Sequence, residues 1–202
     1  MSSTLSANEA ACVTGVPLKQ VHRIIDAGLL DAAGTGDGRS RAIRCDALVG
    51  LKLAHDTTDL ITLDGRRRLV RYLLDHPEAR TARERDVSVD VRAMKGEVRN
   101  GLSMLASARD AIECDESVLS GTPCFKGTRI PVHDIADMLA NGDSAGAIHE
   151  AFPQLSKAQI ELADFYARAY PRRGRPRREP FWRVRKPTAT SETALGDLPA
   201  PR

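Results

Sequence analysis

Side chains able to contact nucleic acid gather in one short segment near the N-terminus. They are Lys19, Gln20, His22 and Arg23. On a helix from Leu18 to Ala27 they occupy the polar face, opposite apolar residues at helical spacing. If this helix enters a major groove of DNA, Gln20 and Arg23 have the geometry for base edges. Lys19 and His22 then reach phosphates more easily.

Signals for two short helices surround these residues. Ser6 followed by Glu9 forms a capping box for a first helix. Gly15 ends that helix, Pro17 suits the first turn of the next, and Gly28 can end the second in a left-handed conformation. The second helix is expected to bury Leu18, Val21, Ile24 and Ile25. Two short helices joined by a tight glycine-containing turn form a helix-turn-helix.

A wing is expected after this unit. Glycines at 34–38 are followed by alternating basic residues, a pattern that predicts a short hairpin. Its expected contacts to the DNA backbone or minor groove are Arg39, Arg41 and Arg44. The alternative for the whole region is a helical hairpin whose basic face is only solvated.

The middle of the chain supplies further helices. They are expected at 46–55 and 64–75, and the second bears Arg66, Arg67 and Arg68. Because these three point in different directions from one turn, a solvated face is the favoured interpretation. The charged residues 78–86 indicate a linker, and the alternation in 87–91 predicts a strand. A helix over 93–112 has an apolar stripe that would pack on the C-terminal region or a second subunit.

Residues 113–170 form an acidic segment. It opens with a hairpin-like stretch rich in Gly and Pro, and helices are expected at 132–141, 144–151 and 156–170, with Ser144 and Ser156 as N-caps. Nine acidic and four basic residues give it a net charge of −5. Phosphates would repel such a segment, so dimerisation or binding of a protein suits it better. Gly127-Thr128-Arg129 is expected to form a turn, with Arg129 in a structural ion pair.

The run from Ser120 to Val132 reads SGTPCFKGTRIPV. With Gly142, Ile148, Phe152-Pro153 and Leu155, it resembles the domain-of-unknown-function family number 433, over about Cys114 to Tyr170. The resemblance implies a helix-turn-helix-like fold and an association with VapB-type antitoxins, which pair with PIN-like ribonuclease toxins. Cys124 and Phe152 depart from the family pattern, which has an aliphatic residue and a Tyr there. The N-terminal region resembles the helix-turn-helix and wing of MerR-type regulators, although 45–112 does not continue into their long dimerising coiled coil.

The segment 171–202 is basic, with nine basic and three acidic residues. It contains an Arg-Gly-Arg-Pro core similar to an AT-hook. Gly174 would let the backbone lie flat in an A/T-rich minor groove, with Arg173 and Arg175 along its floor. The alternative is a general affinity for DNA. The last fifteen or so residues have the composition of a disordered segment.

Two adjacent aromatic residues follow in this tail. Exposed Trp usually marks a contact, so Phe181 and Trp182 are candidates for binding a toxin. Arg183 or Arg185 would neutralise a carboxylate cluster of that toxin. The alternative is that both aromatic rings pack on the chain's own helices.

Several classes of protein are disfavoured. No motif joins a nucleophile to a His or Asp, so we expect no enzyme and no catalytic residues. No glycine-rich phosphate loop occurs, and the four cysteines show no metal-ligand spacing, so no cofactor and no metal are expected. No run of about 18 apolar residues and no signal peptide are present, so we expect a cytoplasmic protein with reduced thiols and no membrane partner.

The sequence therefore predicts a mainly α protein. Its expected parts are a winged helix-turn-helix (1–77), a linker strand and helix (78–112), an antitoxin-like helical domain (113–170) and a basic, largely disordered tail (171–202). The expected function is that of a type II antitoxin, which inhibits a PIN-like ribonuclease toxin and represses its own operon by binding operator DNA as a homodimer or larger assembly. The alternatives are a stand-alone MerR-like regulator and an architectural minor-groove binder.

Overall fold

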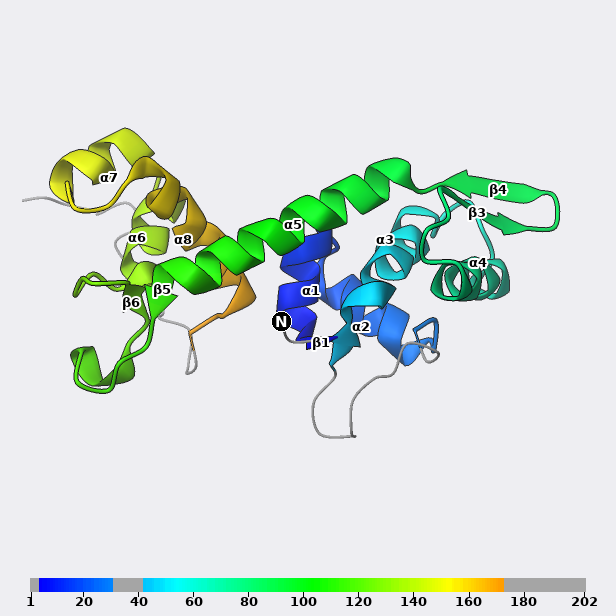
Figure 1. Cartoon of the computed structure of the whole chain (residues 1–202), viewed down its shortest axis with the longest axis horizontal. Coiled ribbons are helices and arrows are strands. Elements are labelled where there is room, and N and C mark those ends of the chain that lie inside the picture. Colours follow the sequence, from blue (N-terminus) through cyan, green and yellow to red (C-terminus); the bar gives the residue numbers. More distant parts are fainter. Residues whose placement is uncertain (1–3, 31–41, 173–202) are drawn as a thin grey trace, which may run out of the picture. The chain divides into compact units, whose positions relative to one another are not determined.

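The computed structural model describes residues 4–30 and 42–172 (Figure 1). These residues are mainly helical and carry short antiparallel strand pairs, as the sequence predicts. The described residues belong to one compact unit, which ends at Arg172. No described helix is long and apolar enough to cross a membrane.

The N-terminal part contains the two helices expected from the capping signals. Ser6 Oγ accepts a hydrogen bond from the Glu9 amide, and Glu9 Oε2 accepts one from the Ser6 amide, so the capping box is confirmed. Gly15 ends the first helix with φ 70°, a conformation that favours glycine. The helices of this part are α1 (Ala7–Thr14), α2 (Leu18–Asp26), α3 (Leu48–Asp56) and α4 (Leu63–Asp75).

The strand at the end of the predicted wing has an unexpected partner. Strand β2 (Ile43–Arg44) pairs with β1 (Thr4–Leu5) at the start of the described chain. Leu5 and Ile43 face each other in this register and are both buried, which explains the pairing. A 3₁₀ helix, η2 (Cys45–Ala47), then leads into α3. The rest of the predicted wing, 31–41, lies outside the described residues.

The linker expected over 78–86 is wrong. Strand β3 (Thr81–Glu84) forms an antiparallel ribbon with β4 (Val87–Asp90), in which Arg83 faces Ser88. The ribbon packs on α4, and Ala82 is fully buried there. The sequence pattern does not reveal this strand, because its other residues are polar or charged and its single buried residue is a small alanine. Little alternation of apolar and polar residues is therefore present in the segment. The strand predicted over 87–91 is confirmed.

Helix α5 (Arg92–Ala111) packs on both sequence halves of the compact unit. Its buried residues Val98, Leu105 and Ala108 belong to the predicted stripe. Helix α5 contacts α1 and α3 from the N-terminal part and α8 from the C-terminal part, so packing on the C-terminal region is confirmed. Gly101 permits a very close approach: a Cβ there would lie 2.2 Å from the carbonyl oxygen of Val13.

The C-terminal elements follow the predicted order. Strand β5 (Ile112–Glu113) pairs with β6 (Cys124–Phe125), and the 3₁₀ helix η3 (Leu119–Gly121) lies between them. The side chains of Ser144 and Ser156 cap the last two helices, as predicted. The helices are α6 (Val132–Ala140), α7 (Ala145–Ala151) and α8 (Lys157–Ala169).

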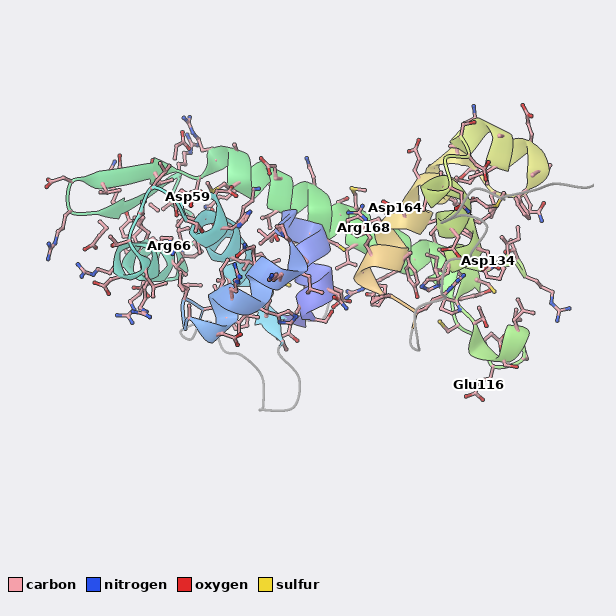
Figure 2. The ribbon with its side chains drawn as sticks, turned by 180° about the vertical axis from the view of Figure 1, so that it is seen from behind. Asp59, Arg66, Glu116, Asp134, Asp164 and Arg168 are labelled. Atoms are coloured by element: carbon pink, nitrogen blue, oxygen red, sulfur yellow. The ribbon has the colours of Figure 1, made fainter. Side chains whose placement is uncertain are left out.

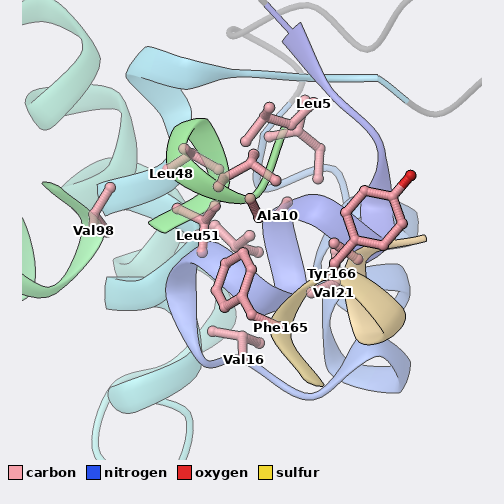
Figure 3. Packing of buried hydrophobic residues seen from close by; sticks show 14 of the residues in the cluster. Leu5, Ala10, Val16, Val21, Leu48, Leu51, Val98, Phe165 and Tyr166 are labelled. Atoms are coloured by element: carbon pink, nitrogen blue, oxygen red, sulfur yellow. The ribbon is translucent and has the colours of Figure 1, made fainter. Parts of the chain in front are cut away.

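A single hydrophobic cluster joins these elements. Figure 3 shows Phe165 and Tyr166 of α8 among buried residues of the N-terminal part, including Ala10 and Val16. Helix α8 contacts α1 as well as α5, α6 and α7. The first helix of the helix-turn-helix is therefore supported by the C-terminal helix of the same unit.

Candidate nucleic-acid interface

The turn between α1 and α2 has the tight geometry of a helix-turn-helix. Thr14 Oγ1 donates to the Ala10 carbonyl at 2.6 Å and accepts from the Val16 amide at 3.3 Å. Val16 is buried, and Gly15 supplies the left-handed residue at which the chain reverses. The turn therefore satisfies its own polar groups and buries an apolar residue between the two helices.

Helix α2 presents its charged residues to solvent. Lys19 and Arg23 are exposed, Gln20 and His22 are half-buried, and Val21 and Ile24 form the buried face. The predicted separation of polar and apolar faces is thus confirmed for these residues. Among residues 4–30 and 42–172, no carboxylate forms an ion pair with Lys19 or Arg23.

Leu18 departs from the prediction. It was expected to be buried, but 39% of its surface is exposed. It is the first residue of α2 and lines an open pocket with Pro17, Cys12 and Arg168. Helical spacing groups Leu18 with the apolar face but does not show which residues of that face are covered.

Other predicted contacts are distributed differently. Arg44 is exposed on β2 but forms an ion pair with Asp46, which would compete with a phosphate for its guanidinium group. The remaining predicted DNA contacts, Arg39, Arg41, Arg173 and Arg175, lie outside the described residues. So do the predicted toxin contacts Phe181, Trp182, Arg183 and Arg185.

Two of the three arginines in the run on α4, Arg66 and Arg67, support other helices, which corrects the expectation of a solvated face for them. Arg68 is exposed, as expected. Arg66 donates to the Ala54 carbonyl and to Thr58 Oγ1, both at 2.9 Å, at the C-terminal end of α3 (Figure 2). Arg67 donates to the Ala27 carbonyl, at the C-terminal end of α2, at 3.0 Å. Helix ends leave such carbonyls without partners, so each arginine stabilises the end of another helix. The three side chains do diverge, as predicted.

Arg67 matters for α2 because it fixes the far end of that helix. The turn at Gly15 holds the start of α2, and the bond from Arg67 to Ala27 holds the residue that caps it. A helix fixed at both ends presents Lys19 and Arg23 in one orientation. This support comes from a residue that is distant in sequence, so local patterns could not reveal it.

A buried carboxylate network connects α1 to the C-terminal part. Glu9 is 6% exposed, and its Oε1 accepts from Arg109 Nη2 at 2.6 Å and from the Tyr170 hydroxyl. Arg109 Nε also donates to the Tyr170 hydroxyl, at 2.7 Å. Burial acts to raise the pKa of Glu9, but hydrogen bonds from Tyr170, Ser6 and Arg109 together hold it below its ordinary value of 4.5. The sequence analysis identified Glu9 only as a capping residue.

Tyr170 also joins this network to α6. Its carbonyl lies 2.8 Å from Nε2 of the buried His133, and its ring packs against Tyr166. Two residues later, Arg172 bonds to Asp134 at 2.5 Å and to Asp137 at 2.9 Å. Both carboxylates lie on α6, so Arg172 pairs with two acidic residues of that helix.

The motif around Gly127 forms the predicted turn. Gly127 has φ 72°, and the Thr128 amide bonds to the Phe125 carbonyl at 2.9 Å. Arg129 is exposed, and no described carboxylate forms the ion pair that was expected for it. Within 4–30 and 42–172, no three His, Cys, Asp or Glu residues gather as metal ligands. None of Cys12, Cys45, Cys114 and Cys124 forms a disulfide.

Comparison with known proteins gives the family. The model described as "Protein of unknown function (DUF433)" matches residues 112–167, which span β5 to α8. The chain belongs to the DUF433 family. An uncharacterized protein of Sinorhizobium fredii (strain NBRC 101917 / NGR234), y4eO, is 30% identical over 194 residues, which are 88% of this chain and 86% of y4eO. No solved structure matches the chain. The family assignment made from the SGTPCFKGTRIPV run is thereby confirmed, whereas its VapB-type and MerR-type associations stay predictions.

Proposed function

We propose that this DUF433 protein is a DNA-binding antitoxin. The unit of α1, its turn and α2 binds operator DNA, and the DUF433 segment with the following tail binds and inhibits a PIN-like ribonuclease toxin. The observation that carries the DNA-binding half is the orientation of α2, which exposes Lys19 and Arg23 while Val21 and Ile24 anchor it.

The physical basis for DNA binding is a rigid helix with cations on its outer face. Phosphate contacts by lysine and arginine supply affinity, and a side chain that reaches base edges supplies specificity. Arg23 suits guanine because its guanidinium can donate two parallel hydrogen bonds. The fixed ends of α2, at Gly15 and at Ala27, reduce the ordering that binding would otherwise require.

The charge distribution supports a protein partner for the DUF433 segment. Residues 113–170 have a net charge of −5, and the exposed Asp and Glu side chains of this segment would be repelled by phosphates. The resemblance to VapB-type antitoxins points to a PIN-like ribonuclease as that partner. The basic tail, 171–202, would then serve DNA, toxin or each in turn.

The DNA-binding half is tested with a duplex taken from immediately upstream of the protein's own gene. The Lys19→Ala/Arg23→Ala variant should lose binding in a fluorescence anisotropy titration. The control Lys126→Ala/Arg129→Ala removes two exposed charges from the acidic segment and should bind as the wild type does. Equal losses in both variants would mean that net charge, and not α2, decides binding.

The antitoxin half is tested by co-expression with the product of the neighbouring gene. The wild type should form a complex with that product and relieve its toxicity, and Trp182→Ala/Arg183→Ala should do neither. Full rescue by the double variant would remove these residues from the proposed toxin contact. DNA binding with no complex and no rescue would favour the stand-alone regulator.

A further inference from the structure

The β3–β4 ribbon carries two arginines, Arg83 and Arg85, and three acidic residues, Glu84, Asp86 and Asp90. It lies alongside α4 (Figure 1), and Arg68 of α4 bonds to Glu84 of β3 at 3.0 Å. Arg67, the preceding residue on α4, bonds to Ala27 at the end of α2. One helical turn of α4 therefore contacts both the end of the proposed reading helix and the ribbon.

Internal partners occupy two of the acidic side chains in the ribbon. Glu84 binds Arg68, and Asp90 binds Arg92 through bonds of 2.5 to 3.1 Å. The hydrogen bonds from Arg92 lower the pKa of Asp90 to about 2. Asp86 is the exposed acid at the tip. Because Glu84 and Asp90 are already paired, they offset little of the charge that the ribbon's free arginines present to solvent.

Two arginines point away from this packing. Arg83 is exposed on the face opposite the buried Ala82, and no described carboxylate pairs with it. The Arg85 side chain is 80% exposed at the tip of the ribbon and lies 3.9 Å from Glu84, whose carboxylate is held by Arg68. Both guanidinium groups are therefore available to an anion in solution.

The backbone at Arg85 is strained. Its φ is 51°, in the left-handed region that favours glycine, yet the turn from Glu84 to Val87 has arginine there. Backbone strain of this kind collects at binding sites, where the side chain is needed for contact. Val87, the first residue of β4, is 45% exposed, so the tip has an apolar surface as well as charged groups.

We propose that the β3–β4 ribbon binds the phosphate backbone of the same DNA, through Arg83 and Arg85. The inference rests on the proposed DNA binding by α2 and assigns a second contact to it. Phosphate contacts of this kind add affinity and salt dependence but no base preference. A two-stranded ribbon with an exposed arginine at its tip has the shape for a backbone contact beside the groove in which a helix lies.

The variant that tests this proposal best is Arg85→Gly, because it should raise the stability of the protein while it lowers the affinity for DNA. Glycine relieves the strain at φ 51°, so the melting temperature of the full chain should rise. Loss of the phosphate contact should weaken binding to the upstream duplex several-fold and lower the slope of log K against log salt by about 1. A higher melting temperature with unchanged binding would show that Arg85 is only a turn residue and would overturn the proposal.

The double variant Arg83→Ala/Arg85→Gly extends the test. It should lower the salt slope by about 2 and weaken binding on the order of tenfold, equally for the upstream duplex and a scrambled one. The charge-matched control is Lys126→Ala/Arg129→Ala, which should leave the slope unchanged.

The two proposals fail in different ways. If the ribbon variant binds as the wild type does while Lys19→Ala/Arg23→Ala loses binding, only the ribbon is excluded. If the wild-type protein binds neither duplex, the DNA-binding proposal fails and the ribbon contact fails with it.

Discussion

Gly101→Ala should force helices α1 and α5 apart. The added Cβ would lie 2.2 Å from the Val13 carbonyl oxygen and 2.8 Å from the Val13 Cα, and both are backbone atoms that no rotamer can move. Ordinary contacts between carbon and oxygen are about 3.3 Å or longer, so the helices must separate by about 1 Å. We expect this overpacking to cost about 3 kcal/mol. The higher helix propensity of alanine offsets up to about 1 kcal/mol of this cost.

Gly96→Ala is the matched control on the same helix. A Cβ at Gly96 meets nothing within 4 Å, so this variant gains helix propensity without overpacking. In urea and thermal unfolding of the full chain, Gly96→Ala should be stabilised by about 0.5 to 1 kcal/mol. Gly101→Ala should be destabilised by about 2 kcal/mol, which separates the two melting temperatures by on the order of 10 °C. Equal stabilisation of both variants would refute the close contact between α1 and α5.

Three further variants test the network and the helix ends. Folding lowers the pKa of Glu9, so the stability that its carboxylate contributes is present above pH 4.5 and is lost as the pH falls through the lower pKa of the folded state. Glu9→Gln should therefore lose about 1 to 2 kcal/mol of unfolding free energy at pH 7, and its unfolding free energy should depend less on pH below 4.5. A loss of the same size at every pH would contradict this. Tyr170→Phe removes the hydroxyl shared by Glu9 and Arg109 and should cost about 1 kcal/mol in urea unfolding, with no change in stability as the opposing result. Arg66→Met removes one of two side-chain donors to the Ala54 carbonyl, because Thr58 Oγ1 also donates to it at 3.0 Å. We expect faster hydrogen exchange at the end of α3 and a loss of up to about 1 kcal/mol. Unchanged exchange there would show that the Arg66 bond contributes nothing.

Local signals predicted the local structure well. The capping pair Ser6 and Glu9, the left-handed Gly28 (φ 65°) and the caps Ser144 and Ser156 each act through hydrogen bonds or backbone angles that span a few residues. The split between exposed Lys19 and buried Val21 follows from helical periodicity. Such features depend on neighbours in sequence, so the residue order contains them.

Tertiary contacts between distant residues were missed for the opposite reason. The Glu9–Arg109–Tyr170 network joins residues up to 161 positions apart, and Arg67 reaches Ala27 across 40 positions. A charged residue looks solvated until its partner is known, which is why two of the α4 arginines were misjudged. Strand β3 was missed because Ala82 is its only fully buried residue.

The central claim is that α2 reads a DNA sequence, and one measurement tests it most directly. It is the ratio of affinities for the upstream duplex and a scrambled duplex, compared between the wild type and Arg23→Ala at one salt concentration. The wild type should prefer its own sequence by about 10³ or more, and Arg23→Ala should lose about 10- to 100-fold of that preference. Equal binding of both duplexes by the wild type, or an unchanged ratio in Arg23→Ala, would contradict the claim.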